Sequence, residues 1–140
     1  MQLKLQNIKK MKINYVTNIR PSPTFFGGPV HLNQGFIIHS NEKKYKTSEN
    51  ILDGVMITSS EEILIDISKD KSPEYAKIFL GCAVWDQGQL DNEILENSWI
   101  ISNSSKDLIF HNHLEFSLWK KCLKNMGVDP SKLVSYSGSA

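Results

Sequence analysis

The chain has 140 residues, 40% of them hydrophobic, and its 16 basic and 15 acidic residues leave a net charge of +1. This length suits one domain with one core, and the balanced charge argues against a nucleic-acid-binding domain, which usually carries a basic stripe. No apolar run approaches the roughly 20 residues of a membrane-spanning helix, and the N-terminus lacks the apolar core of a signal peptide, so we expect a cytoplasmic protein without direct nucleic-acid or membrane binding.

The first predicted elements are a helix and a strand that ends in a glycine turn. Apolar residues at helical spacing predict a helix over residues 3–11, and Pro21 and Pro23 interrupt regular structure after it. Phe25-Phe26 predicts a strand end, and the turn Gly27-Gly28-Pro29 follows. Its amides could form an anion nest, but the lysine of a phosphate-binding loop is missing. A turn that needs φ > 0 explains the glycines more simply.

The middle of the chain predicts strands around a lysine-rich loop, and then a helix. Residues 36–39 and 55–58 are rich in β-branched and aromatic side chains, so we expect strands there. Ser59, with Glu62 three residues later, is a capping-box pattern that predicts a helix start. The core stripe of this helix would be Ile63, Leu64 and Ile67.

The second half predicts three more strands and two helices. Residues 76–83, 99–101 and 108–110 predict strands, and Gly88 precedes a short helix over residues 89–97. A final helix is indicated by apolar residues at helical spacing and by Gly127, which follows the last turn. Its apolar residues are Phe116, Trp119, Leu123 and Met126. Strands and helices mixed without regular alternation predict an α+β fold.

The helix over residues 89–97 is the best candidate site. Spacing its residues 100° apart places Leu90, Ile94 and Leu95 on a buried arc, bordered by a polar stripe of Gln89, Glu93 and Asn97. With Trp85 nearby, this stripe could converge on a ligand or partner. Alternatively, the stripe hydrogen-bonds adjacent loops, as buried polar groups must, and Trp85 and Trp99 are core residues.

Few other residues suggest chemistry. His39, at a strand end beside Ser40, could orient a polar site, although a histidine satisfied within its strand is a simpler interpretation. The H-N-H letters at residues 111–113 lack the further ligands of a metal set. Cys82 and Cys122 fit no metal spacing, and we interpret them as buried, reduced thiols. We expect no metal, no cofactor and no catalytic motif.

Several motifs, in order along the chain, resemble the signature of the AlgH/YqgE family of small bacterial proteins. They occupy residues 27–30, 35–40, 53–60 and 80–99, and the last is the most informative. Each motif is weak alone, but together they make the resemblance strong. The positions that the resemblance marks as structural are Gly27, Gly28, Pro29, Gly54, Gly81 and Gly88.

The resemblance implies a single α+β domain over residues 1–140, with a strongly bent, partly barrel-like mixed sheet and helices packed around it. Members usually begin with additional strands, so we expect a domain shortened at its N-terminus. Cys82 stands where the family usually has an aromatic residue, and Ser139 stands where it often has histidine. The family's naming associates one branch with transcriptional regulation of exopolysaccharide synthesis.

Three functional hypotheses remain open. In the first, a non-enzymatic binding or indirect regulatory protein uses the surface from Trp85 to Asn97 for an unknown protein or small molecule. In the second, an enzyme of unknown reaction uses Glu93 and His39 as acid/base groups, which requires both side chains to converge in one pocket. In the third, a shortened sheet exposes an edge through which copies associate. The sequence fixes no oligomeric state.

Overall fold

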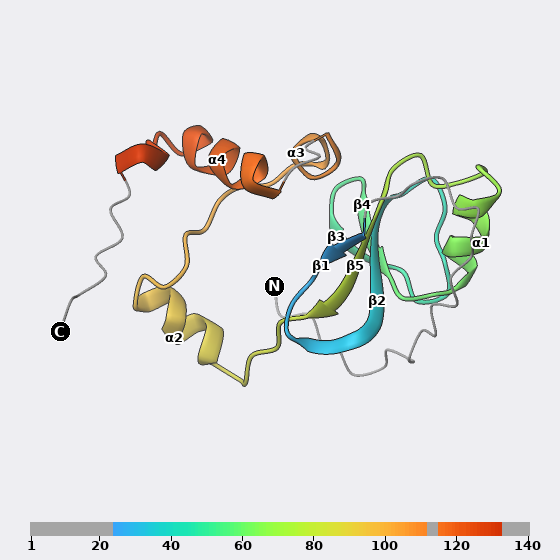
Figure 1. Cartoon of the computed structure of the whole chain (residues 1–140), viewed down its shortest axis with the longest axis horizontal. Coiled ribbons are helices and arrows are strands. Elements are labelled where there is room, and N and C mark those ends of the chain that lie inside the picture. Colours follow the sequence, from blue (N-terminus) through green and yellow to red (C-terminus); the bar gives the residue numbers. More distant parts are fainter. Residues whose placement is uncertain (1–23, 112–114, 133–140) are drawn as a thin grey trace. The chain divides into compact units, whose positions relative to one another are not determined.

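The computed structural model describes residues 24–111 and 115–132 (Figure 1). The chain divides into two compact units, Met1–Gln87 and Gly88–Ala140. The helix expected over residues 3–11, and the residues Phe116, His113 and Ser139 named above, lie outside the part whose side chains are described.

A mixed sheet forms the framework of the first unit. Its strands are β1 (Thr24–Phe26), β2 (Val30–Ser40), β3 (Glu49–Leu52), β4 (Val55–Thr58) and β5 (Ala76–Cys82). They lie in the order β1-β5-β2-β4-β3, with β1 parallel to β5 and the other pairs antiparallel. This confirms the α+β fold. The sheet is not closed into a barrel, because β1 and β3 are the two edges of its described part.

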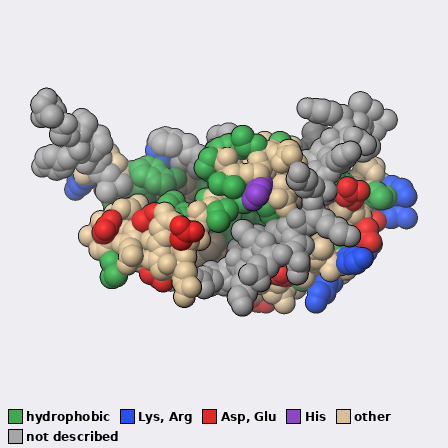
Figure 2. Space-filling view, turned by 90° about the horizontal axis from the view of Figure 1, so that it is seen from below, with side chains coloured by type: hydrophobic (Ala, Val, Ile, Leu, Met, Phe, Trp, Pro, Cys, Tyr) green, Lys and Arg blue, Asp and Glu red, His purple; other side chains and the backbone are tan. Residues whose placement is uncertain are grey.

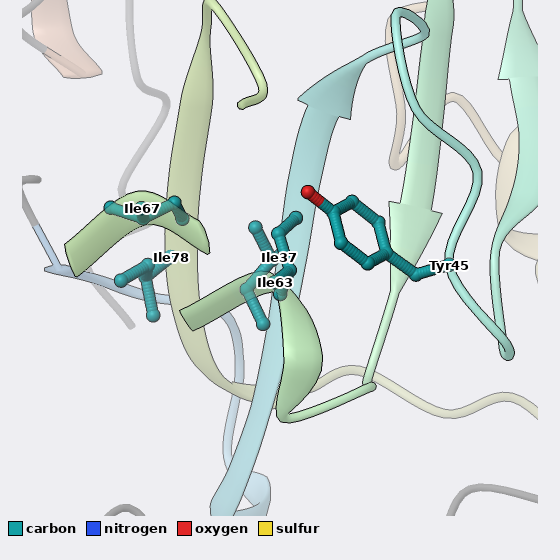
Figure 3. Packing of buried hydrophobic residues seen from close by; sticks show 5 residues of the cluster. All are labelled: Ile37, Tyr45, Ile63, Ile67 and Ile78. Carbon is teal, nitrogen blue, oxygen red and sulfur yellow. The ribbon is translucent and has the colours of Figure 1, made fainter. Parts of the chain in front are cut away.

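Helix α1 (Glu62–Ser68) packs on one face of this sheet. Ile63 and Ile67 of α1 meet Ile37 of β2 and Ile78 of β5, and Tyr45 from the loop after β2 joins them (Figure 3). Burying each isoleucine stabilises the fold by roughly 1.5–3 kcal/mol. The predicted core stripe is therefore confirmed, with Leu64 packed at its margin.

The capping box predicted at the start of α1 is wrong. Glu61 occupies the N-cap position and makes no side-chain capping bond. Ser59 instead lies at the end of β4, where its backbone amide and hydroxyl donate to the Thr47 hydroxyl oxygen at 3.1 and 3.4 Å. Ser59 is thus engaged in tertiary hydrogen bonds rather than in a local cap.

The second unit contains helices α2 (Gln89–Leu95), α3 (Lys106–Phe110) and α4 (Glu115–Asn125), and a short 3-10 turn (Pro130–Lys132). The strand predicted at residues 108–110 is wrong, because Ser105 caps a helix there: its hydroxyl accepts from the Leu108 amide at 3.1 Å. Residues 99–101 form no strand either. A strand needs a pairing partner, and no strand occurs in the described part of this unit.

The predicted end of α4 is confirmed. Gly127 has φ 74°, and the Val128 amide donates to the Leu123 carbonyl at 2.9 Å. This is the Schellman arrangement that glycine favours. Leu123 is buried, whereas Trp119 and Met126 are exposed. Among the described residues, no helix is long and apolar enough to cross a membrane.

Backbones of the first unit approach closely where three glycines meet. The Gly27 amide donates to the Leu80 carbonyl at 2.7 Å. A Cβ on Gly27 would lie 2.2 Å from the Gly81 carbonyl oxygen, and a Cβ on Gly81 would lie 2.4 Å from the Gly28 carbonyl oxygen. Only glycine fits such contacts. Close approach, together with φ 75° at Gly81, therefore accounts for these residues.

Gly81→Ala should destabilise the protein by about 3 kcal/mol, because it combines a left-handed backbone with a backbone clash. Gly88→Ala is the matched control: its φ is 79°, but a Cβ there meets nothing within 4 Å. We expect the control to lose only about 1 kcal/mol. Urea denaturation of both variants measures the difference, and equal losses would contradict the close approach.

Candidate functional site

Helix α2 is bounded by two residues with left-handed backbones. Gly88 precedes it with φ 79°, and Asn97 follows it with φ 59°. The Asn97 amide donates to the Ile94 carbonyl at 3.0 Å, and the Ser98 amide donates to the Glu93 carbonyl at 2.9 Å. These two bonds define a Schellman motif. Asn97 therefore turns the chain back toward the helix it ends.

This turn brings Trp99 onto the polar side of α2. The Trp99 indole N–H donates to one carboxylate oxygen of Glu93 at 2.7 Å, and the Gln89 amide donates to the other at 3.0 Å. Gln89 and Glu93, two members of the predicted polar stripe, are thus hydrogen-bonded to each other. The third member, Asn97, contributes through its backbone, which ends the helix. Trp99 is the site residue whose role the sequence did not reveal. One signal for this contact was present in the sequence: asparagine at a helix end tolerates the left-handed conformation that turns the chain back.

The buried arc predicted for α2 is wrong, since none of its residues is buried. Leu90 and Ile94 are half-buried, and Leu95 is 79% exposed. At 100° per residue, Leu95 lies about 100° around the axis from Ile94, between Asp91 and Asn92. The predicted arc was too wide, and Leu95 belongs to the charged side.

The segment after α2 is apolar and exposed, and we call Trp99, Ile100 and Ile101 the Trp99 surface. Their exposed fractions are 48%, 53% and 66%. Leu95 lies about 160° around α2 from Glu93, to which Trp99 is bonded, so it lies on the other side of the helix. The acidic side chains Asp91 and Glu96 are also exposed. In Figure 2, red acidic side chains gather over the region of α2. Clustered apolar exposure of this kind marks interaction sites.

The remaining predicted positions lie in the first unit. Trp85 is half-buried in the segment that follows β5. Gly54, with φ 72°, lies in the turn between β3 and β4. Pro29 is exposed and immediately precedes β2.

His39 is buried inside the first unit, with 0% exposure. Its Nδ1 lies 2.8 Å from the Ser40 carbonyl oxygen, and its Nε2 lies 3.4 Å from the Ser48 hydroxyl. A carbonyl only accepts, so Nδ1 carries the proton and Nε2 accepts from Ser48. Burial lowers the pKa of His39, against smaller raising effects of the Ser40 carbonyl and of Glu42. His39 and Glu93 are thus each hydrogen-bonded within their own unit.

The loop that contains Ser48 is held against α1 by a second polar group. The Tyr45 hydroxyl donates to the Asp66 carboxylate at 3.0 Å, and Lys43 forms an ion pair with the same carboxylate. Burial, and then the bond to Asp66, raise the pKa of Tyr45 to about 12. The hydrogen bond from Lys43 lowers the pKa of Asp66.

The described residues include no group of three or more His, Cys, Asp or Glu side chains that could hold a metal ion. His111 ends α3, where its Nδ1 lies 2.9 Å from an Asp107 carboxylate oxygen. Cys82 and Cys122 are free, and each is half-buried rather than buried as expected.

These features define a small α+β protein with a mixed five-stranded sheet, a glycine crossing between β1 and β5, and a glycine-preceded helix after β5. The chain belongs to the AlgH-like family (DUF179), whose model matches residues 1–131.

The chain is similar to UPF0301 proteins of several bacteria. A UPF0301 protein of Xanthomonas campestris pv. campestris (strain B100) is 38% identical over 122 residues, covering 87% of this chain and 64% of the relative. One from Erwinia tasmaniensis is 33% identical over 137 residues, covering 95% and 73%. The chain therefore spans just under two thirds of the length of the first of these relatives.

A solved structure shows the same fold. The solution structure of the AlgH protein from Pseudomonas aeruginosa matches with a TM-score of 0.65 and 29% sequence identity. The match covers 84% of this chain and 61% of that protein.

Glu93→Ala should release the Trp99 indole N–H. Its hydrogen exchange, followed by NMR, should quicken about threefold to tenfold, as expected for loss of a bond worth about 1 kcal/mol. Glu96→Ala is the control, because it removes an equal charge from the end of the same helix and leaves Glu93 in place. Unchanged exchange in Glu93→Ala would contradict the bond.

His39 should make the protein less stable in mild acid. Its folded pKa lies below the ordinary 6.5, so between these two values the unfolded chain binds more protons. The free energy of unfolding should therefore fall as pH drops below 6.5 toward the folded pKa, and this fall should shrink in His39→Gln. In His31→Asn, which alters an exposed histidine, the wild-type fall should persist. Denaturant titrations at several pH values measure the free energy of unfolding. Identical pH profiles for the wild type and His39→Gln would contradict the role of His39 in this pH dependence.

Proposed function

We propose that this chain is a non-catalytic binding protein, and that its Trp99 surface holds a protein partner. In this proposal, any regulation by the protein is indirect and passes through that partner. The protein works in the cytoplasm. The observation that carries the proposal is the Trp99 indole, which is bonded to Glu93 while about half of the side chain stays exposed.

Pre-organisation is the first argument for a binding role. Side chains that are already ordered lose less entropy on association. The Schellman turn and the bond from the Trp99 indole to Glu93 hold that ring in one place before any partner arrives. Tryptophan is also enriched among the residues that dominate binding energy at protein interfaces.

The exposure of this surface favours a protein partner over a small molecule. Small-molecule sites are concave, and they bury most of their ligand against apolar walls. The Trp99 surface instead presents large side chains to solvent, and Ile100 and Ile101 are each more than half exposed. A partner with a comparable apolar surface could cover them.

Hydrogen bonding supports the non-catalytic role. A general base must reach its substrate within hydrogen-bond distance. His39 is buried, with both ring nitrogens near oxygen atoms of its own unit. Glu93 accepts from Trp99 and Gln89, which suits a positioning role.

Photo-crosslinking in cells tests the proposal. A photoreactive phenylalanine analogue at Ile101 should give a discrete protein adduct. The same analogue at Ile65, which is 52% exposed on α1, should not. Trp99→Ala should reduce the Ile101 adduct about tenfold or more. Equal labelling from both positions would contradict the proposal.

Native mass spectrometry distinguishes a small-molecule ligand from a protein partner. The freshly purified wild type should carry no small molecule that is absent from Glu93→Gln. A retained small molecule that disappears in this variant would place a small-molecule ligand at α2 and overturn the choice of a protein partner.

A further inference from the structure

We infer that the loop between β2 and β3, residues 41–48, responds to acid: protonation of His39 favours an open state in which the Ser48 end of the loop is released and the rest of the fold persists. We call this segment the His39 loop. The inference goes beyond the proposed function, because it concerns the first unit and does not involve the Trp99 surface.

The His39 loop supplies side chains that cover the His39 imidazole. Ser48 Oγ lies 3.4 Å from Nε2, and the Tyr45 ring meets the imidazole edge-on, with ring centroids 5.3 Å apart. The Tyr45 amide donates to the Ser48 hydroxyl oxygen at 2.9 Å, so the two covering residues are also joined to each other. The strand that carries His39 is paired on both sides, with β4 and with β5. Movement of the loop therefore exposes the ring at a lower free-energy cost than separation of the strands.

A protonated His39 does not suit the closed arrangement. In the neutral ring, Nδ1 donates to the Ser40 carbonyl and Nε2 accepts from the Ser48 hydroxyl. Protonation makes Nε2 a donor, so the Ser48 hydroxyl loses the acceptor of its own proton. The imidazolium would also be fully buried, since His39 has 0% exposure, and a buried charge is costly unless it is paired. Both effects favour the open state.

The surroundings of the ring set the direction of the pH dependence. Burial lowers the pKa of His39, and the Ser40 carbonyl and the Glu42 carboxylate only partly offset this effect. The neighbouring strands β4 and β5 place Met56 and Ala76 beside His39, and neither side chain titrates. In the open state the ring meets water and regains a pKa near 6.5. Opening therefore takes up a proton, and it is favoured as the pH falls from 6.5 toward the folded pKa.

The middle of the His39 loop stays in place in mild acid. The Tyr45 ring packs beside Ile37 in the core (Figure 3), and its hydroxyl donates to the Asp66 carboxylate on α1 at 3.0 Å. The hydrogen bond from Lys43 lowers the pKa of Asp66, so this carboxylate remains ionised where His39 titrates. The release is therefore confined to the Ser48 end of the loop.

Release of this end also reaches the corner between β4 and α1. Thr47 Oγ1 lies 2.9 Å from Thr58 Oγ1 and accepts from the Ser59 amide at 3.1 Å. Thr47 is exposed and adjacent to Ser48, so these bonds open together with the contact to His39. Acid therefore loosens the attachment of the loop to the residues that precede α1.

Amide hydrogen exchange of the full chain, followed by NMR from about pH 7.5 to about pH 5, tests the inference. Rates are converted to protection factors, which removes the intrinsic pH dependence of exchange. Protection of the Tyr45 and Ser59 amides should fall about threefold to thirtyfold, as the uptake of one proton allows. Amides of β2 should stay more protected at each pH. Low concentrations of denaturant should reduce the protection of β2 and leave that of Tyr45 and Ser59 nearly unchanged, because a local opening exposes little surface.

Two pairs of variants assign the effect to His39. His39→Gln should remove the fall in protection, whereas His31→Asn, which alters an exposed histidine, should keep it. Glu42→Gln should move the fall to lower pH by roughly 0.2–0.7 pH unit, the effect of one exposed charge that favours the imidazolium. Glutamine at this position retains an acceptor for the Ser40 hydroxyl. Glu49→Gln removes an exposed acid from β3 and should leave the pH of the fall unchanged.

Three results would overturn the inference, and none of them bears on the Trp99 surface. Equal protection of the Tyr45, Ser59 and β2 amides at every pH would show that the loop opens only by global unfolding. A local opening that does not vary with pH, or that varies equally in His39→Gln, would show that His39 does not control it. If His39→Gln does not fold, an unchanged pH of the fall in Glu42→Gln would overturn the inference, and the expected shift would support it.

Discussion

The passage of the Gly27-Gly28 backbone across Gly81 is the constraint on which the first unit depends. It pairs β1 parallel to β5, and in a sheet that is otherwise antiparallel this is the one parallel pair among the described strands. Contacts of 2.2–2.4 Å to an added Cβ leave no room for any other residue. Since β5 also pairs with β2, the crossing fixes the edge of the sheet and the point at which the chain leaves it at Cys82.

Around this framework, polar contacts fasten the long connection between β2 and β3. His39 and Ser48 join its end to β2, and Tyr45 and Asp66 join its middle to α1. The same tyrosine ring belongs to the apolar core, so one residue links core packing to loop position. Buried polar groups of this kind cost stability unless they are paired, which explains why each has a partner.

In the second unit, helix ends decide where functional side chains lie. Asn97 adopts a left-handed backbone, as Asp70 and Gly127 do after α1 and α4. Because the chain reverses at Asn97, an indole two residues later meets a carboxylate on the preceding turn. A single backbone conformation thus orders the Trp99 indole against α2, at the start of the exposed apolar segment of residues 99–101.

The sequence by itself determined the α+β class, strands β2, β4 and β5, the core stripe of α1, the glycine end of α4 and the family. The structural features depend on local periodicity, on β-branched composition and on glycine, all of which neighbouring residues express. The family followed from several motifs that resemble its signature in order along the chain. Only the tertiary structure decided β3, the helix at residues 106–110, the exposure of Leu95 and the partners of His39 and Trp99. Strand pairing, burial and hydrogen bonding depend on residues distant along the chain, and a pattern of neighbours cannot specify them.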